Sequence, residues 1–275
     1  SKQQIKQQLE SQPKATPLQF CFAINCHQPV GNFYHVIEET FQKSYLPFID
    51  VMEKHPAIPF ALHYTGSLWQ WLEAKHPGFI DRIAAMVRRG QVELLGGSYY
   101  ECILPLVSQQ DKVEQIQRLS DYLQKRFGQR PKGMWLAERV WEPSLASTLA
   151  ETGIEYVTLD DMHFFGCGFT EADTQAYYST HDNGPSVDIF PISEKLRYLI
   201  PFRPVHEVFD YFHQLPRDGS VLLTLADDGE KFGAWPRTHD WVFGQHWLHH
   251  FLDGLEQSQV VTAVTFSQHR ARVAS

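Results

Sequence analysis

The chain has 275 residues, with 24 Lys and Arg against 32 Asp and Glu, so its formal net charge is −8. This acidic balance argues against a nucleic-acid-binding protein, which would present a basic face. Hydrophobic residues make up 43% of the chain and charged residues 20%, which is typical of a globular protein and excludes a disordered one.

Strand and helix patterns alternate along the chain after residues 1–16, which are rich in Gln and Lys and are expected to form a loose arm. Strands are predicted at residues 18–25, 58–64, 91–96, 133–137, 154–160, 220–226 and 260–266. Helices are predicted at residues 33–55 with a break at Pro47, 67–76, 78–89, 108–127, 143–151, 204–214 and 238–257. Residues 163–200 carry the least regular pattern and are expected to wander above the other elements.

Regular alternation of this kind predicts parallel strands joined by right-handed helical crossovers. Seven or eight strands in about this length favour one barrel over two domains. We therefore expect an α/β fold, a parallel β/α barrel, over residues 17–275.

The sequence also indicates where in the cell the protein is expected to be found. Its apolar stretches, such as residues 221–226, are far shorter than the about 20 residues needed to cross a bilayer. The first residues contain no apolar signal core. We expect a soluble, cytoplasmic protein that binds neither nucleic acid nor membrane. The four cysteines, Cys21, Cys26, Cys102 and Cys167, are too few and too scattered for a disulfide framework and are expected to be reduced.

Ionisable residues and histidines close nearly every predicted strand, and in a β/α barrel the chemistry collects at the carboxyl ends of the strands. These residues are His27, His63, Glu101, Glu138, Asp160, Asp161, Asp227, Asp228 and Glu230. The alternation of side chains along a strand predicts that His27, His63, Glu93, Asp160 and Asp228 face the barrel interior. Glu138 lies on the same strand face as the apolar residues Met134 and Leu136, so the alternation of side chains alone does not predict that it faces the barrel interior.

Two carboxylates on opposite sides of a glycosidic bond can cleave it, because one attacks or activates water while the other protonates the leaving oxygen. Glu138 and one of Asp227 and Asp228 are candidates. Crowding with Glu230 is expected to raise at least one carboxyl pKa in this group through like-charge repulsion. Four tryptophans near these motifs are candidate walls for sugar rings: Trp69, Trp135, Trp141 and Trp235.

Each of these residues also has a plainer interpretation when it is taken alone. A single carboxylate at a strand end more often caps a helix, and Asp227-Asp228-Gly229 is a turn signal. His27 is equally compatible with a buried histidine whose bonds are satisfied, and tryptophans are often core residues. The joint arrangement of these residues favours a site.

Four segments resemble, in order, the first sequence motifs of glycoside hydrolase family 57. They are His27-Gln28-Pro29, the segment 90–97 (GQVELLGG), the segment 135–143 (WLAERVWEP) and the segment 227–236 (DDGEKFGAWP). The resemblance covers about residues 18–240. It implies a (β/α)7 barrel, a distorted TIM-like barrel, and a retaining mechanism on α-1,4-glucans without a cofactor or metal.

The resemblance also implies roles for single residues. Glu138 matches the nucleophile and Asp228 the general acid/base. His27 and Glu93 match residues that line the sugar site, and Trp235 matches a substrate-contacting tryptophan. His63 and Asp160 join the predicted substrate-binding set because of their place at the strand ends. The form of the 227–236 motif is most similar to that of 4-α-glucanotransferases and amylopullulanases.

Family enzymes usually continue past the barrel into a helical region and a β-rich domain, which this chain is expected to lack.

Two other hypotheses about the function remain open. A metal-dependent polysaccharide deacetylase on a related barrel would bind zinc through residues such as His27, His63, Asp160 and Asp161. A non-catalytic glucan-binding fragment would bind maltooligosaccharides without turnover. The oligomeric state and the balance between hydrolysis and transfer are not indicated by the sequence.

Overall fold

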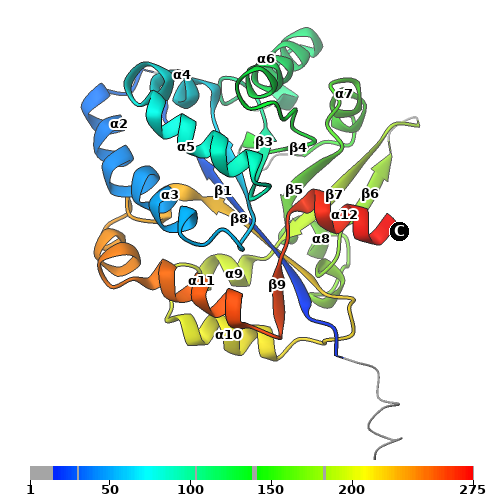
Figure 1. The fold of residues 1–275 in the computed structure, drawn as a ribbon. Coiled ribbons are helices and arrows are strands. Elements are labelled where there is room, and N and C mark those ends of the chain that lie inside the picture. The colour runs from blue at the N-terminus through cyan, green and yellow to red at the C-terminus, as the bar shows by residue number, and fades with distance from the viewer. Residues whose placement is uncertain (1–14, 30, 103, 138–140, 182–183, 275) are drawn as a thin grey trace, which may run out of the picture.

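The computed structural model describes residues 15–29, 31–102, 104–137, 141–181 and 184–274. Within these residues, seven parallel strands lie side by side in the order β7-β5-β4-β3-β2-β1-β8 (Figure 1). The strands are β1 (Leu18–Cys26), β2 (Phe60–Tyr64), β3 (Val92–Gly96), β4 (Gly133–Met134), β5 (Tyr156–Asp160), β7 (Ser186–Ile192) and β8 (Leu222–Asp228). Strand β6 (Tyr178–His181) pairs antiparallel with β7, and β9 (Val261–Ala263) pairs parallel with β1.

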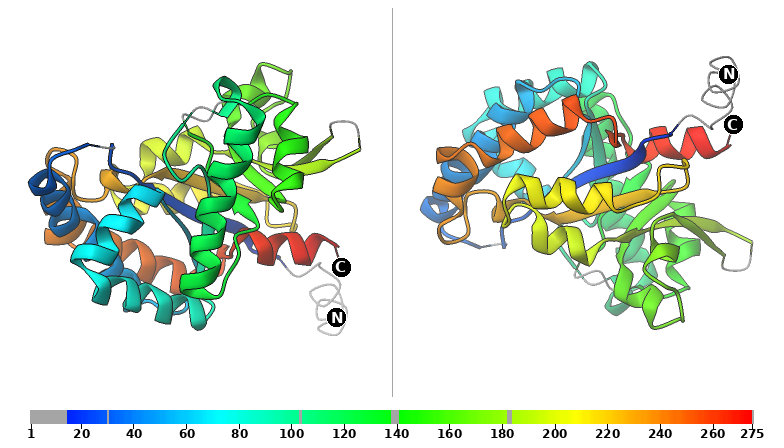
Figure 2. Two further views of the ribbon diagram at one scale, coloured as in Figure 1. Left: turned by 90° about the horizontal axis from the view of Figure 1, so that it is seen from above. Right: turned by 90° about the horizontal axis from the view of Figure 1, so that it is seen from below.

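Helices enclose the strands from outside, as the views from above and below show (Figure 2). The helices between β1 and β5 are α2 (Tyr34–Thr40), α3 (Leu46–Glu53), α4 (Gly66–Lys75), α5 (Pro77–Arg88), α6 (Gln109–Phe127) and α7 (Leu145–Glu151). The later helices are α8 (Asp161–Phe165), α9 (Glu194–Leu199), α10 (Val205–His213), α11 (Trp247–Gln257) and α12 (Phe266–Ala274).

The two end strands of the parallel sheet, β7 and β8, approach each other. The backbone nitrogen of Ser193, the residue after β7, donates to the Thr224 carbonyl of β8 at 2.9 Å. Alternation along β1 separates two cores, as predicted: Cys21 and Ala23 belong to the interior cluster, whereas Phe20 and Phe22 pack against the helices. The predicted α/β barrel of seven parallel strands is therefore confirmed.

Several elements of the described structure were not predicted from the sequence: α8, β6, β7, α9 and α12. Strand β7 lies in the irregular stretch, where Gly184, Pro185 and an internal Pro191 mask its apolar alternation. The predicted final strand is shorter, and Phe266 instead begins α12. The Phe266 ring packs inside the barrel at 4.8 Å from Phe190 between ring centroids, so this helix is anchored by its first residue.

Two predicted helices also differ in detail. No break occurs at Pro47, which lies in the first turn of α3, and the backbone stays helical before and after it. Instead a π-helical turn, Phe41–Tyr45, joins α2 to α3. The predicted helix at residues 238–257 is divided at His246, whose φ of 61° is left-handed.

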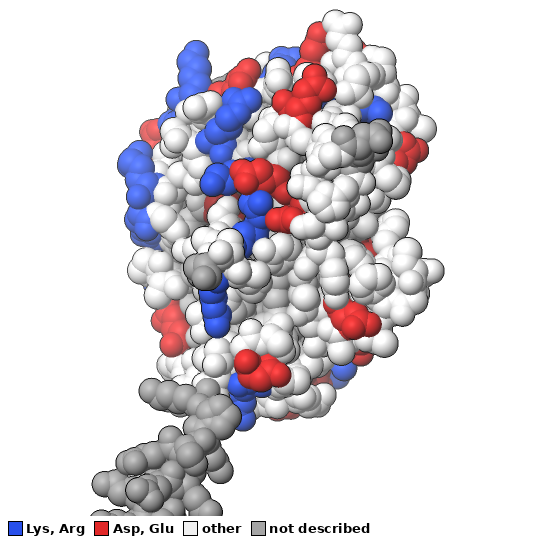
Figure 3. Space-filling model, turned by 90° about the vertical axis from the view of Figure 1, so that its right-hand side faces the viewer, with Lys and Arg blue, Asp and Glu red and all other residues white. Residues whose placement is uncertain are grey.

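Other sequence-based expectations agree with the structure. Ser108 caps α6 by accepting from the Asp111 nitrogen, and Gly128 ends the helix in a left-handed conformation. All four cysteines are free thiols. In the part of the chain that the structure describes, no helix has both the length and the apolar character needed to cross a bilayer. On the face drawn in Figure 3, basic and acidic side chains are interspersed and much of the surface is uncharged.

Candidate active site

Asp228, Asn25 and His63 form one row across three neighbouring strands. Asn25 is the register partner of both Asp228 on β8 and His63 on β2, at the carboxyl ends of all three strands. Asp228 shares its strand parity with Ala226, which belongs to the interior cluster, so it faces the barrel mouth. Asp228 is half-buried, and no described residue forms an ion pair with its carboxylate. The structure thus brings the predicted general acid/base and His63 to one rim.

Glu230 connects the turn after β8 to the end of β1. Its Oε1 accepts from the His27 backbone nitrogen at 2.9 Å and from the Tyr45 hydroxyl at 2.7 Å. Burial raises the pKa of Glu230 above its ordinary value. Like-charge repulsion, which the sequence suggested for this group, is not the cause. Tyr45 was not singled out from the sequence, since nothing in its spacing relates it to a residue 185 positions later.

Two cations hold Asp227. The Lys231 Nζ lies 2.7 Å from its Oδ2, and the Arg197 Nε lies 3.4 Å from the same atom. Arg197 also forms an ion pair with Asp160, with its Nη1 3.5 Å from Oδ1. Asp227 is therefore committed to ion pairs, which leaves Asp228 as the residue of this pair that is suited to proton transfer. Asp160 lies beside this network, close to the predicted site.

His63 is buried beneath the rim. Its Nδ1 donates to the Leu95 carbonyl at 3.2 Å, because a carbonyl can only accept, so Nε2 is the acceptor nitrogen of the neutral ring. Burial lowers the pKa of His63 to about 4. The ring lies parallel to that of Trp135, with 6.4 Å between centroids. A neutral imidazole in this place can accept a hydrogen bond from a hydroxyl.

Of the four candidate tryptophans, only Trp235 is exposed, with 44% of its surface accessible. It lies 5.9 Å from the Phe202 ring between centroids, and the Lys231 Nζ lies 5.0 Å from the Trp235 centroid. Trp69 and Trp135 are core residues, and Trp141 packs against the cluster behind β4 and β5. Trp235 and Phe202 therefore form the aromatic platform beside Asp228 and its turn.

Polar atoms without a described partner gather at the end of β1. Among the described residues they are Asn25 Oδ1, His27 Nδ1 and Glu230 Oε2, all buried. The His27 Nε2 lies 3.8 Å from Glu101 Oε2. Buried polar atoms normally find a hydrogen-bond partner, so this group is suited to a polyhydroxylated ligand.

The structure does not bring Glu93 to this row. Glu93 is the register partner of Ala61, two residues before His63, and its carboxylate accepts from the backbone nitrogen of Ser267 at 3.2 Å and from the Ser267 hydroxyl. Its described contacts are with the first turn of α12 and with Tyr156 of β5, a residue of the interior cluster. A role of Glu93 in the sugar site stays a prediction of the resemblance.

Glu138, the predicted nucleophile, lies outside the described residues, so its distance from Asp228 stays a prediction.

Asp161, a candidate zinc ligand in the deacetylase hypothesis, is buried. Its carboxylate accepts a hydrogen bond from the Glu194 nitrogen at 3.2 Å, at the start of α9. Within the described residues, His27, His63, Asp160 and Asp161 do not form a group with metal-ligand spacing.

Residues 6–274 match the family model of glycosyl hydrolase family 57. The chain belongs to this family. Alpha-amylase 1 of Dictyoglomus thermophilum is 46% identical over 256 residues, which are 92% of this chain and 37% of that relative. The 4-alpha-glucanotransferase of Thermococcus litoralis is 40% identical over 256 residues, 93% of this chain and 39% of that relative.

The crystal structure of the Thermococcus litoralis 4-alpha-glucanotransferase matches with a TM-score of 0.91 at 40% identity, over 94% of this chain and 40% of that chain. The chain therefore spans about two fifths of the length of these relatives. A putative polysaccharide deacetylase from Mycobacterium smegmatis matches with a TM-score of 0.62 at 14% identity. At that identity the likeness concerns the fold alone and does not favour the deacetylase hypothesis.

Proposed function

We propose that this chain is the catalytic barrel of a retaining enzyme of α-1,4-glucans, of the 4-α-glucanotransferase or α-amylase type. The observation that carries the proposal is the identity of 40–46% to relatives with these names over more than nine tenths of the chain. The row of Asp228, Asn25 and His63 at the barrel mouth supports it.

In this mechanism, Glu138 attacks the anomeric carbon while Asp228 protonates the glycosidic oxygen of the leaving chain. The bond from the anomeric carbon to that oxygen breaks as the glycosyl-enzyme forms. Asp228, now ionised, takes a proton from the acceptor hydroxyl, which then displaces Glu138. Water as acceptor gives hydrolysis, and a sugar hydroxyl gives transfer. A retaining pair predicts carboxyl groups separated by about 5–5.5 Å.

Trp235 and Phe202 support the substrate side of the proposal, because an exposed aromatic pair suits the apolar face of a glucose ring. His63 Nε2 and the buried polar atoms at the end of β1 suit its hydroxyl groups. These contacts fix the substrate next to Asp228.

The test is incubation with maltotriose followed by chromatography of the products. Longer oligosaccharides support transfer, and glucose with maltose alone supports hydrolysis. No change in the substrate would contradict catalysis by this chain. Asp228→Asn is expected to lower kcat by about 10²–10⁴-fold, as loss of a general acid does. The matched control is Asp210→Asn, which changes an exposed carboxylate of α10.

A glycosyl fluoride separates the roles of the two carboxylates, because fluoride leaves without help from an acid. Asp228→Asn is expected to release fluoride in the first turnover, whereas Glu138→Gln is expected to release none. Release by Glu138→Gln at the wild-type rate would remove this residue from the nucleophile's role.

A further inference from the structure

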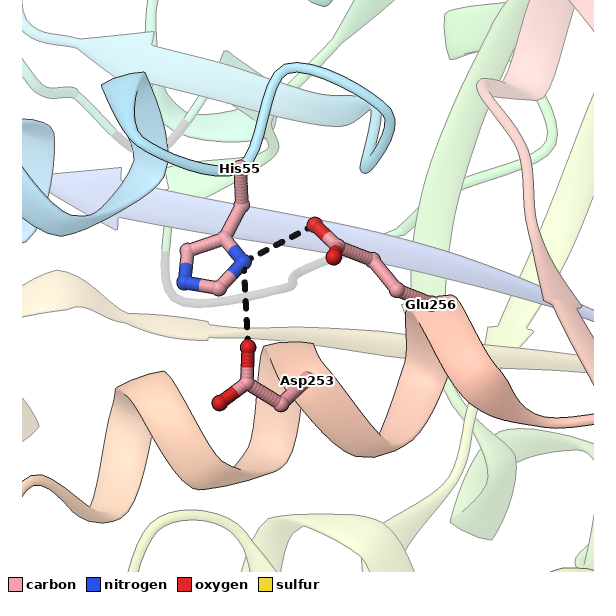
Figure 4. Close-up of side chains that lie close together, drawn as sticks. All are labelled: His55, Asp253 and Glu256. Atoms are coloured by element: carbon pink, nitrogen blue, oxygen red, sulfur yellow. Dashed lines mark hydrogen bonds and ion pairs between the residues drawn. The ribbon is translucent and has the colours of Figure 1, made fainter.

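A second cluster of ionisable groups lies in the outer helical layer, between the end of α3 and helix α11. His55 follows α3, which leads into β2, so the cluster lies towards the amino-terminal ends of the strands and away from the Asp228 row. The His55 side chain is only 7% exposed. It packs against α11 (Figure 4). On α11, His249, Asp253 and Glu256 are spaced i, i+4 and i+7, which places them on one face of the helix.

The ring of His55 is held on both sides. Its Nδ1 lies 2.9 Å from Glu256 Oε1 and 3.8 Å from Asp253 Oδ1 (Figure 4). Its Nε2 lies 3.0 Å from His249 Nδ1. The three donor atoms of His55, Asp253 and Glu256 lie within 4.8 Å of one another. A single point between them can therefore be reached by one nitrogen and two carboxylate oxygens.

The protonation of the His55 and His249 rings bears on whether a cation can bind between these donor atoms. One of the facing nitrogens, His55 Nε2 or His249 Nδ1, must carry the proton of their hydrogen bond. When His55 Nε2 donates, a neutral His55 directs the lone pair of Nδ1 at two carboxylates. Lone pairs and carboxylate oxygens repel each other, so in this tautomer a cation between them takes the place that the Nδ1 proton occupies when His249 is the donor.

We propose that His55, Asp253 and Glu256 bind one divalent first-row cation, with Zn²⁺ as the best match. One imidazole and two carboxylates neutralise the charge of Zn²⁺ and leave its fourth tetrahedral position to water. Bonds of about 2.0–2.2 Å to such ligands separate neighbouring donor atoms by about 3.3 Å. The observed 2.9 and 3.8 Å separations lie on either side of this value.

The remaining features of the cluster fit this assignment. With a cation on Nδ1, the Nε2 of His55 can donate to His249, and a hydrogen bond on the second ring nitrogen is how the orientation and tautomer of a metal-binding histidine are usually fixed. The Asp253 side chain is 54% exposed, so the cation has an open path from solvent. The bound ion would tie the α3–β2 connection to α11, two segments about 200 residues apart in the sequence, and so stabilise the outer layer.

The test is calorimetric titration of the chelator-treated chain with zinc chloride, together with its thermal unfolding with and without Zn²⁺. Wild type is expected to bind one Zn²⁺ at this site and to gain a few degrees in Tm at saturation. Asp253→Asn and Glu256→Gln keep the side-chain shape and are each expected to weaken binding by about tenfold or more. The double variant is expected to lose the Tm gain.

His250→Ala and Asp210→Asn are the matched controls, because both residues are exposed and neither belongs to the cluster. Wild-type affinity and Tm gain in these controls are expected. No Zn²⁺ binding by wild type, or unchanged binding by the double variant, would overturn the proposal. Turnover of maltotriose is expected to be the same in the double variant, so failure of this site and failure of the proposed function can be told apart.

Discussion

The carboxylate of Glu230 accepts a hydrogen bond from the backbone nitrogen of His27, at 2.9 Å and across 203 residues of sequence. This bond joins the turn after β8 to the end of β1, directly beside the row that contains Asp228. Gly229 makes the approach possible, because a Cβ at this position would collide with the Cys26 Sγ. Glu230 thus positions the strand end from which His27 projects.

Glu230→Gln is expected to change how stability depends on pH. Burial raises the pKa of Glu230 in the folded chain above the ordinary 4.5. Its contribution to stability is therefore full below pH 4.5 and is lost as the pH rises through the raised value. A glutamine does not ionise and lacks this loss. Urea unfolding between pH 4.5 and 7.5 should show wild type losing stability relative to the variant.

The control for Glu230 is Glu151→Gln, which changes an exposed carboxyl of α7. Its stability curve should run parallel to that of wild type across this pH range. If the Glu230→Gln curve also ran parallel to wild type, the pKa of Glu230 would not be raised in the folded chain.

His63 is expected to stay neutral throughout the physiological range. Its pKa is lowered from 6.5 to about 4 by burial, so its contribution to stability is present above pH 6.5 and is lost as the pH falls towards 4. A shift of this size corresponds to about 3 kcal/mol. NMR titration of the ring protons should show no transition for His63 between pH 5.5 and 8. A midpoint near 6.5 for His63 would contradict burial as the dominant influence on its pKa.

The sequence predicted those features that depend on local pattern. The apolar and small faces of β1 followed from strict alternation, and Ser108 and Gly128 marked the ends of α6 by their own chemistry. It also placed Asp228 and His63 at one rim, because parallel strands bring their carboxyl ends together.

Features that depend on distant partners could not be predicted in this way. The hydrogen bond of Tyr45 to Glu230 and the two ion pairs of Arg197 join segments that only the folded barrel brings together. Alternation along β3 places Glu93 on the face that points into the barrel. It does not indicate whether the side chain lies near the carboxyl or the amino end of the strands. Its partner Ser267 belongs to α12, where the sequence pattern predicted the end of a strand at Phe266 and no further element.

Trp235→Ala is expected to raise KM for maltooligosaccharides by about tenfold with little change in kcat, since the ring binds ground state and transition state alike. Trp235→Phe keeps an aromatic face next to Phe202 and should recover most of the affinity. Steady-state kinetics on maltotriose measure both constants. Val273→Ala, which removes an exposed apolar side chain on α12, is the control. A fall in kcat alone for Trp235→Ala would exclude a binding platform.

Ser267→Ala tests whether Glu93 stabilises the folded chain or binds the substrate. Both the backbone nitrogen and the hydroxyl of Ser267 donate to the buried Glu93 carboxylate, and burial raises the pKa of Glu93. Loss of the hydroxyl leaves a buried acceptor with one bond fewer, which costs about 1–3 kcal/mol. We expect Ser267→Ala to lower the free energy of unfolding by this amount and to leave KM for maltotriose unchanged.

Glu93→Gln completes the comparison, because it keeps the shape of the side chain and removes its charge. For a residue that holds α12, we expect turnover of maltotriose to stay within about twofold of wild type, since α12 lies at the end of the barrel remote from Asp228. Ser186→Ala, at an exposed position of β7, controls for the serine substitution. A hundredfold loss of kcat/KM in Glu93→Gln with unchanged unfolding would instead assign Glu93 to the sugar site, as the resemblance to the family predicts.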